Sequence, residues 1–579
     1  MPTLNWIGKE KVVNHHLDVP FRTLEKQYTF ASDGQDDGGN MIIHGDNLDA
    51  LKALLPMYEG KVKCIYIDPP YNTGNEKWVY NDNVNDPHIR AWLGKVVGAE
   101  GEDFSRHDKW LCMMYPRLKL LQKLLSDDGA IFISIDDTEY ANLKLLCDEI
   151  FGASCFISNI SWQRTYSTRN DSKGIVNEVE HILAYSKLPD WNPNKLPRTE
   201  EMNSKYGNPD NDVTLWRTDN AFAPGAATHQ GMVYAIQHPF TGKLLYPANG
   251  RCWTFGQEQM LDIMCGWCNY ELKELDDAHE RAIVCGVPES EVREGVKAIV
   301  LSEPLEISAQ KAKAVYDHGQ WPRFFFTKGG KGGIARKTYL DNVGGKLPTN
   351  FWPHIETGHT DEAKKEMLTL FDGRATFDTP KPARLIEFVL KIAADSDAII
   401  LDSFAGSGTT AHAVLNMNKR DGGHRKFILV EMMDYADNIT AERVKRVIQG
   451  YGEGKKAVEG TGGGFSYYEL GEALMMDGLL NPDVSIDKIR AYVYYTETHT
   501  AIPTLKEDEP YLLGVHNDHA YYFYYEKDRV TTLNHAFLGS MKTAAQGYLI
   551  YADVNALSAE EMEKYHITFK KIPRDIANL

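Results

Sequence analysis

Short apolar runs alternate with amphipathic helical patterns in two separate stretches of this chain. The first runs from about residue 40 to 154 and the second from about 351 to 450. Strands that alternate with helices at this spacing predict a parallel, doubly wound α/β sheet. Because the sequence between the two stretches is irregular, we expect one sheet whose two sequence halves flank an insertion.

The 579 residues are enough for several domains. The glycine-rich stretch GYGEGKKAVEGTGGGFSYYELG after Gly450 is interpreted as a loop or linker. Beyond it, the aromatic segments AYVYY, YLLGVHNDHAYYFYY and GYLIYADV predict strands of a small C-terminal α+β domain. The predicted parts are an N-terminal segment at 1–39, sheet residues at 40–154, an insertion at 155–350, further sheet residues at 351–450, and the linker with the C-terminal domain at 451–579.

The composition limits the possible partners and location. A formal charge of −18 excludes nucleic-acid binding over the whole surface, so any DNA site must be a local basic patch. No apolar run approaches the ~20 residues of a membrane span, and the first residues lack the pattern of a signal peptide. We therefore expect a cytoplasmic protein with no membrane partner.

Asp68-Pro69-Pro70-Tyr71 directly follows an apolar, strand-like run. Ligands of a doubly wound sheet bind beyond the carboxyl ends of its strands. Because prolines lack an N–H donor, the carbonyls here are available as acceptors. The Asp68 carboxylate and the Pro69 carbonyl suit the two hydrogens of an exocyclic amine, and Tyr71 suits stacking on a base. A strand followed by a rigid turn is the alternative for so short a motif.

A glycine-rich turn follows another apolar run and opens a helical pattern: Phe404, Ala405, Gly406, Ser407, Gly408, Thr409 and Thr410. Glycines permit close approach of a ligand, and a helix N-terminus favours a carboxylate or phosphate. Such a loop alone also fits NAD or a nucleoside phosphate. Glu431 ends the next strand-like run, where an acid can hold a ribose diol or can simply be solvated.

Together these motifs resemble the β class of amino-methylating DNA methyltransferases, in which DPPY precedes the target-recognition region and FxGSGTT follows it. The order is the same here, with DPPY at 68–71 and FAGSGTT at 404–410. The resemblance implies a Rossmann-like methyltransferase sheet interrupted by a target-recognition insertion. It also implies S-adenosylmethionine as cofactor and double-stranded DNA as substrate.

Three further segments resemble motifs of the same class. Asp46, in HGDNL, matches an acid near the cofactor adenine. The segment Ser134-Ile135-Asp136-Asp137 matches one that shapes the base pocket, and Lys381, in TPKP, matches a lysine near the methionine carboxylate. Taken singly, Asp46 also fits a helix cap, Asp136 a turn acid and Lys381 a surface charge.

The segments LNWIGKEKVVNHH, HTDEAKKEM, GGGFSYYELG and FKKIP resemble modification (Mod) subunits of type III restriction systems. This resemblance implies a homodimer that recruits a helicase-nuclease partner, the restriction (Res) subunit. Since the chain has no helicase signature, the partner is implied by analogy alone.

The end of the predicted insertion is locally basic. Residues 321–346 contain one acid, Asp341, and six cationic residues, which are Arg323, Lys328, Lys331, Arg336, Lys337 and Lys346. Basic residues on a glycine-rich loop suit contacts with DNA phosphates, and a mobile surface loop is the alternative. We expect Phe324–Phe326 to form a core strand.

Four cysteines lie in the predicted insertion: Cys252, Cys265, Cys268 and Cys285. The spacing of Cys265 and Cys268 is one that zinc ligands use, but a second such pair is missing. We therefore expect buried free thiols and no metal.

These motifs favour an enzyme that methylates adenine N6 of a flipped base. The first motif residue is Asp, rather than the Ser that is commoner in cytosine-N4 members of the resembled class. Cytosine-N4 methylation remains open, as does a non-catalytic DNA-recognition subunit that kept the fold. An RNA or small-molecule methyltransferase would not need the long insertion.

Overall fold

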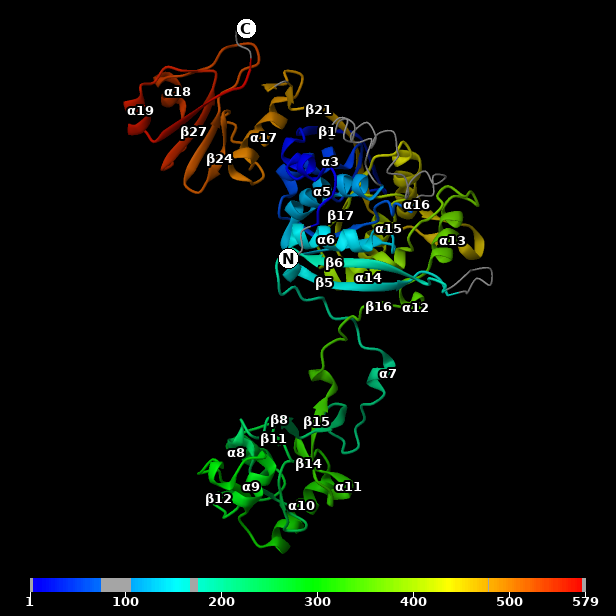
Figure 1. The fold of residues 1–579 in the computed structure, drawn as a ribbon, viewed down its shortest axis with the longest axis vertical. Coiled ribbons are helices and arrows are strands. Elements are labelled where there is room, and N and C mark those ends of the chain that lie inside the picture. The colour runs from blue at the N-terminus through cyan, green and yellow to red at the C-terminus, as the bar shows by residue number, and fades with distance from the viewer. Residues whose placement is uncertain (1–3, 74–105, 167–174, 477, 575–579) are drawn as a thin grey trace. The chain divides into compact units, whose positions relative to one another are not determined.

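The computed structural model describes residues 4–73, 106–166, 175–476 and 478–574 (Figure 1). It divides into two compact units, one of residues 1–194 and 348–579 and one of residues 195–347. The predicted insertion boundary at 155 is therefore wrong, because the chain first adds two strands to the central sheet. The insertion begins at Lys195 and ends at Leu347.

A ten-stranded sheet forms the centre of the first unit. In spatial order its strands are β1 (Arg22–Ala31), β21 (Gly464–Ala473), β2 (Met41–His44), β18 (Lys426–Glu431), β17 (Ile399–Asp402), β3 (Val62–Ile67), β4 (Leu125–Ile135), β6 (Val179–Ser186), β5 (Phe156–Gln163) and β16 (Phe351–Trp352). The strands from β21 to β4 are parallel, while β1 and β6 pair antiparallel with their neighbours. The two sequence halves interleave in one doubly wound sheet, which confirms the predicted fold class.

Helices cover this sheet in two groups. Alternate strand residues such as Ile65 and Ile133 join a buried cluster with α3, α5 and α6. Their neighbours Cys64 and Phe132 are equally buried and point to the other face, because successive side chains of a strand alternate. Up to residue 450, the described helices of this unit are α1 (Lys9–Val12), α2 (His15–Asp18), α3 (Asn47–Tyr58), α5 (Arg106–Leu124), α6 (Tyr140–Phe151), α12 (His354–Thr357), α13 (Thr360–Leu370), α14 (Ala383–Ala393), α15 (Thr409–Asp421) and α16 (Glu442–Gln449).

The stretch that was interpreted as a linker after Gly450 contains a strand of the central sheet. Strand β21 pairs parallel with β2 and antiparallel with β1. One strand from before residue 40 and one from after residue 450 thus lie side by side at this edge of the sheet. Only residues 450–463 match the prediction of a loop, with the short pair β19 (Gly450–Tyr451) and β20 (Val458–Glu459) within them.

The insertion has its own aromatic core, which includes Trp216, Trp253 and Trp267. Phe324–Phe326 form the buried strand β14, as predicted. Three sheets are made of β7 (Trp216–Asn220), β8 (Phe222–Pro224), β9 (Ile236–Gln237), β10 (Leu244–Leu245), β11 (Arg251–Trp253), β12 (Tyr270–Lys273), β13 (Ala298–Leu301), β14 and β15 (Ile334–Tyr339). The helices are α7 (Glu200–Asn203), α8 (Gln257–Met264), α9 (Ala278–Cys285), α10 (Leu305–His318) and α11 (Thr327–Gly330).

The C-terminal residues form the predicted α+β fold, with one difference. AYVYY belongs to helix α17 (Ile486–Thr498) and not to a strand, because Val493 and Tyr494 pack on one helix face in a local core. The other elements are β22 (Met475–Met476), β23 (Leu479–Leu480), β24 (Leu512–His516), β25 (His519–Phe523), β26 (Thr532–Leu533), α18 (His535–Ser540), β27 (Gly547–Ala552), β28 (Val554–Asn555), α19 (Ala559–Lys564) and β29 (Ile567–Lys571).

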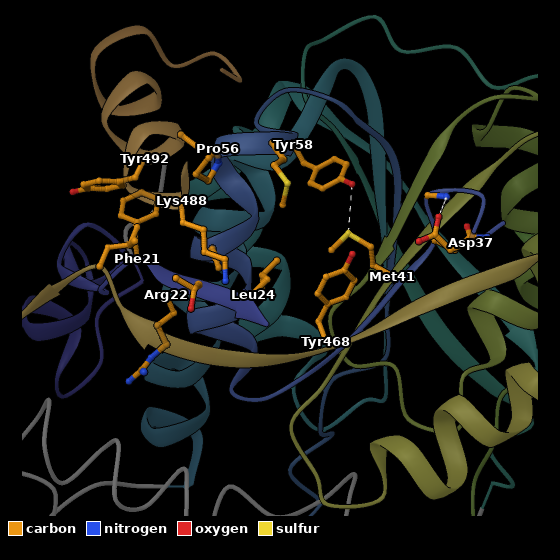
Figure 2. Close-up of a pocket in the computed structure, with 17 residues that line it drawn as sticks. Phe21, Arg22, Leu24, Asp37, Met41, Pro56, Tyr58, Tyr468, Lys488 and Tyr492 are labelled. Carbon is orange, nitrogen blue, oxygen red and sulfur yellow. Dashed lines mark hydrogen bonds between the residues drawn. The ribbon is translucent and has the colours of Figure 1, made fainter. Parts of the chain in front are cut away.

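An apolar cavity of about 330 Å³ lies between α3, α17 and the edge strands β1 and β21. Figure 2 shows Phe21, Tyr58, Tyr468 and Tyr492 around it. The cavity lies near Met41, where β2 begins, and therefore at the sheet edge opposite to the strand ends that bind ligands in such folds. Among the described residues, no helix is both long and apolar enough to cross a membrane.

Candidate active site

The two predicted motifs meet although they are far apart in the sequence. Strands β3 and β17 are parallel neighbours, so the loops that follow them leave the sheet at the same edge. These loops and the TPKP segment line one narrow cavity of about 30 Å³. Its lining residues are Tyr66, Asp68, Phe377, Thr379, Pro380, Lys381, Asp402, Phe404, Ala405, Gly406, Ser407, Thr409 and Thr410. The DPPY and FAGSGTT loops, which are far apart in the sequence, therefore border the same cavity.

The glycine loop has the geometry that its sequence predicts. Gly406 and Gly408 have φ of 52° and 80°, in the left-handed region that favours glycine. A Cβ on Gly408 would lie 3.0 Å from the Thr440 carbonyl oxygen. Thr440 Oγ1 in turn donates a 2.6 Å hydrogen bond to the carbonyl of Gly406. The loop is thereby held closely against the segment that leads into α16.

A buried arginine that sequence reasoning missed supports this loop. Arg443 Nη1 donates to Ser407 Oγ at 2.8 Å and to Thr409 Oγ1 at 2.7 Å. Its Nη2 donates to Glu366 Oε2 of α13 at 3.1 Å. Arg443 is one of three cationic residues on the amphipathic helix α16, and the sequence carries no signal that singles it out.

Asp402, at the end of β17, is a second missed residue. Its carboxylate accepts hydrogen bonds from Thr410 Oγ1 at 2.6 Å and from Phe404 N at 3.0 Å. Burial raises the pKa of Asp402 to about 7, although these hydrogen bonds oppose the rise. A signal existed, because an acid at a strand end follows the same rule that singled out Asp68.

The centre of the site is a buried group of four charged or polar side chains. Lys381 Nζ lies 2.8 Å from both Asp68 carboxylate oxygens, 2.7 Å from Tyr71 Oη and 3.1 Å from Glu180 Oε1. Tyr71 Oη also lies within hydrogen-bond distance of both carboxylates, at 2.7 Å from Asp68 and 2.6 Å from Glu180. Lys381 is therefore a buried residue in direct contact with Asp68, and the alternative of a surface charge is wrong. Glu180 is a third residue that sequence reasoning missed.

Charge keeps Lys381 protonated in spite of its environment. Burial lowers the pKa of Lys381, but the charges of Asp68 and Glu180 outweigh burial, so the pKa lies above its ordinary value. Lys381 and Glu180 are only 10% and 5% exposed. The site therefore holds one buried cation against two carboxylates.

The remaining motif residues lie around this centre. Glu431 Oε2 accepts the Gly406 N–H at 2.8 Å, which joins the end of β18 to the glycine loop. Asp46 caps helix α3 by accepting the Leu48 N–H, which is the alternative that its sequence left open. Ser134 bonds to Tyr66 Oη at 2.7 Å, while Asp136 accepts from the Thr138 N–H in a turn.

The residues present suit a cofactor with polar groups at the glycine loop. Ser403 Oγ, directly before FAGSGTT, is buried and has no hydrogen-bond partner among the described residues. A buried hydroxyl without a partner costs free energy unless a ligand or water satisfies it. Ser403 and the N-terminus of α15 are therefore places where a ligand can gain hydrogen bonds.

The six cationic residues of the basic stretch differ in their exposure to solvent. Arg323, Lys328 and Lys331 are exposed, whereas Arg336 and Lys346 are partly buried. Arg336 Nη2 donates to Asp219 at 2.9 Å. The prediction for Lys337 is wrong, because its side chain is fully buried and its Nζ is held by Asp210, Asp212 and the Trp321 carbonyl. A DNA phosphate has no access to it.

The four insertion cysteines are free and do not form one group. Cys252 and Cys285 pack in one small apolar cluster, while Cys268 belongs to the aromatic core and Cys265 is exposed. Among the described residues, no three His, Cys, Asp or Glu side chains are arranged to hold a metal ion.

Comparison with known proteins gives several relatives that are similar in sequence. The chain is 34% identical over 70% of its length to the StyLTI Mod subunit, a type III restriction-modification enzyme of Salmonella typhimurium. It is 29% identical over 74% of its length to the EcoPI Mod subunit of Escherichia phage P1. It spans only 57% and 63% of those two proteins. The type II methyltransferase M.KpnI of Klebsiella pneumoniae is 31% identical, and the match covers 68% of this chain and 81% of that protein.

The profile of the N6/N4 DNA methylase family matches residues 62–442. This range includes both loops of the cavity, the insertion between them and the group around Lys381. The chain therefore belongs to the DNA methylase family.

Proposed function

We propose that this protein transfers a methyl group from S-adenosylmethionine to adenine N6 of a base flipped out of duplex DNA. The observation that carries this proposal is the shared cavity, in which Asp68 of DPPY faces residues of FAGSGTT. An acceptor for an amine and a loop suited to the cofactor thus adjoin each other. Family membership supports an exocyclic amine of DNA as the target.

The chain's own residues mainly orient the reactants. Bound S-adenosylmethionine supplies an electrophilic methyl group. Asp68 and the Pro69 carbonyl accept the two amine hydrogens and turn the nitrogen lone pair toward that group, which is catalysis by positioning. The Pro70 carbonyl already accepts a hydrogen bond from Trp110 Nε1 at 2.6 Å. Tyr71 stacks on the extruded base and offsets part of the few kcal/mol that flipping costs.

The cofactor would lie along the glycine loop. Phe404 to Thr410 and Ser403 provide hydrogen-bonding groups, and Glu431 and Asp46 are the candidates for the ribose and adenine. Arg443 keeps the Ser407 and Thr409 hydroxyls in place.

DNA recognition is assigned to the insertion. Arg323, Lys328 and Lys331 are the exposed cations of its basic stretch, and Arg336 and Lys346 flank them. Similarity to Mod subunits of type III restriction-modification enzymes supports a site-specific enzyme of a type III-like system. A homodimer, a Res subunit as partner and a cytoplasmic location belong to the same proposal.

A radiochemical assay tests the proposal. Tritiated methyl transfer from S-adenosylmethionine should occur with duplex DNA and not with RNA or free nucleosides. Digestion of the product and mass spectrometry should give N6-methyladenine, whereas N4-methylcytosine would shift the assignment to the other base of the same family. Absence of transfer with cofactor bound would favour a non-catalytic recognition subunit.

A further inference from the structure

Lys381 has more oxygen neighbours than it has hydrogens. Its Nζ is within 3.1 Å of four oxygens, two on Asp68, one on Tyr71 and one on Glu180. An ammonium group carries three donors. At any time, one hydrogen is therefore shared between two oxygens or one oxygen is left out.

The Tyr71 hydroxyl also has more acceptors nearby than hydrogens to donate. Its hydroxyl lies 2.7 Å from Asp68 Oδ1 and 2.6 Å from Glu180 Oε1, but it has only one hydrogen to donate. The Tyr71 hydroxyl and the Lys381 ammonium can thus each move a hydrogen bond from Asp68 to Glu180 while they stay in the site. Glu180 is a second acceptor placed beside the first.

The proposed reaction benefits from this exchange. Asp68 must accept a hydrogen from the base amine, and its two oxygens already accept from Lys381 and from Tyr71. A carboxylate offers about four acceptor positions, so Asp68 is nearly filled before the amine arrives. A second carboxylate beside Lys381 keeps the buried ammonium compensated while Asp68 turns to the amine.

Glu180 is well placed for that task. It lies on β6, where it pairs with Trp162 of β5, and the next residue, His181, also pairs with Ile135 of β4. Its other oxygen, Oε2, is 3.8 Å from Arg164 Nη1, which leaves Oε1 to face Lys381 and Tyr71. The ring of Trp162, opposite Glu180 on β5, lies 5.9 Å from Lys381 Nζ.

We propose that Glu180 is a positioning residue that takes over Lys381 and the Tyr71 hydroxyl when Asp68 turns to the target amine. The role rests on the proposed function. It assigns no new bond-making step, because Glu180 acts through its two neighbours. It keeps the Tyr71 ring in place for the base while Asp68 changes partners.

The test is Glu180→Gln, with Glu178→Gln as the matched control two residues earlier in the chain. Glu180→Gln removes the negative charge that faces Lys381, and it should lower kcat on duplex DNA by about 10- to 100-fold. The Kd for S-adenosylmethionine, measured by calorimetry, and the thermal midpoint should stay near wild type. Glu180→Asp, which keeps the charge at shorter reach, should recover part of the activity.

A double-mutant cycle with Tyr71→Phe separates this role from a general structural one. Tyr71→Phe removes the hydroxyl and Glu180→Gln removes the charge that it faces, so both changes weaken the same contact. The double variant should therefore lose less than the product of the two single losses. Full multiplication of the losses, or wild-type kcat in Glu180→Gln, would overturn the role of Glu180. If Glu180→Gln fails to fold, Glu180→Asp replaces it in the same cycle with Tyr71→Phe, and full multiplication of the two losses there overturns the role.

The reference is transfer by the wild-type chain. If the wild type transfers no methyl group to any DNA, the proposed function fails and the role of Glu180 fails with it. If the wild type is active and Glu180→Gln matches it, only the role of Glu180 fails.

Discussion

Two buried lysines show how the catalytic site and the insertion differ. Lys337 has three hydrogens and three acceptors, on Asp210, Asp212 and the Trp321 carbonyl, at 2.5–2.7 Å. Lys381 has four oxygen neighbours for the same three hydrogens, and it borders a cavity. The first lysine is saturated and enclosed, whereas the second can change partners.

A buried ion pair is thus not by itself a functional feature. A saturated pair is compatible with a structural role, since any rearrangement would leave a buried charge uncompensated. An excess of acceptors beside a cavity permits rearrangement at low cost. Changes on the catalytic side should therefore reduce activity, and changes on the insertion side should reduce stability.

Asp68→Ala should have the largest effect. Loss of the amine acceptor should reduce methyl transfer by at least about 10³-fold, because positioned acceptors supply much of the catalysis. Cofactor binding should remain largely intact. Tritiated transfer and calorimetry measure the two quantities, and full activity in this variant would refute the role of Asp68.

Lys337→Met tests the insertion side. It leaves Asp210 and Asp212 buried without their cation, so the free energy of unfolding should fall by about 3–5 kcal/mol. Denaturant unfolding followed by tryptophan fluorescence reports it, since the Trp216 ring lies 4.9 Å from Lys337 Nζ. A loss below about 1 kcal/mol would contradict the saturated arrangement.

The stability of the unit that contains the candidate active site should depend on pH through Asp402. Its folded-state pKa of about 7 is above the ordinary 3.8, so the native state holds the proton more tightly than the unfolded chain. Its contribution to stability is complete below about pH 4 and falls by about 1.4 kcal/mol per unit as the pH rises toward 7. Asp402→Asn should remove that slope.

The difference between variant and wild type isolates this contribution, because other groups titrate as well. His16, whose pKa burial and nearby lysines lower to about 4, contributes a slope of opposite sign. Asp397→Asn, at an exposed position, is the control. Parallel pH profiles for Asp402→Asn and wild type would show that Asp402 is ionised at neutral pH.

The smallest effects are expected from exposed lysines of the insertion. Lys328→Gln and Lys331→Gln should each weaken binding to all DNA sequences and reduce the slope of log K against log salt by about 0.9. Fluorescence anisotropy at several salt concentrations measures both. Lys313→Gln, an exposed lysine of α10 outside the basic stretch, is the control. An unchanged slope would remove these residues from the DNA contact.

The central parallel strands could be predicted because both of their faces are buried. Strands β3, β17 and β18 are therefore nearly continuous apolar runs. Strand β21 escaped prediction because its glycines and half-exposed tyrosines and glutamates resemble a loop. The prediction of a strand for AYVYY is wrong because β propensity depends on context. The segment forms a helix whose buried face packs in a local core.

For the site, contiguous motifs were predictable and single residues were not. Asp68 and the glycine loop stand next to apolar runs, so the sequence shows where they lie in the sheet. Glu180 is one carboxylate on a strand, and only the fold brings it to Lys381. Likewise, no local pattern distinguishes buried Lys337 from exposed Lys328.

The strand order has a consequence for synthesis on the ribosome. Strands β2 and β3 are consecutive in the sequence, but β18 and β17, from residues 399–431, lie between them in the sheet. A nascent chain that has not reached residue 399 has nothing to fill that gap, and such long-range pairing forms late. Translation must pass the whole insertion before the central sheet can close, so a chain that ends before residue 399 lacks two of the inner strands of this sheet.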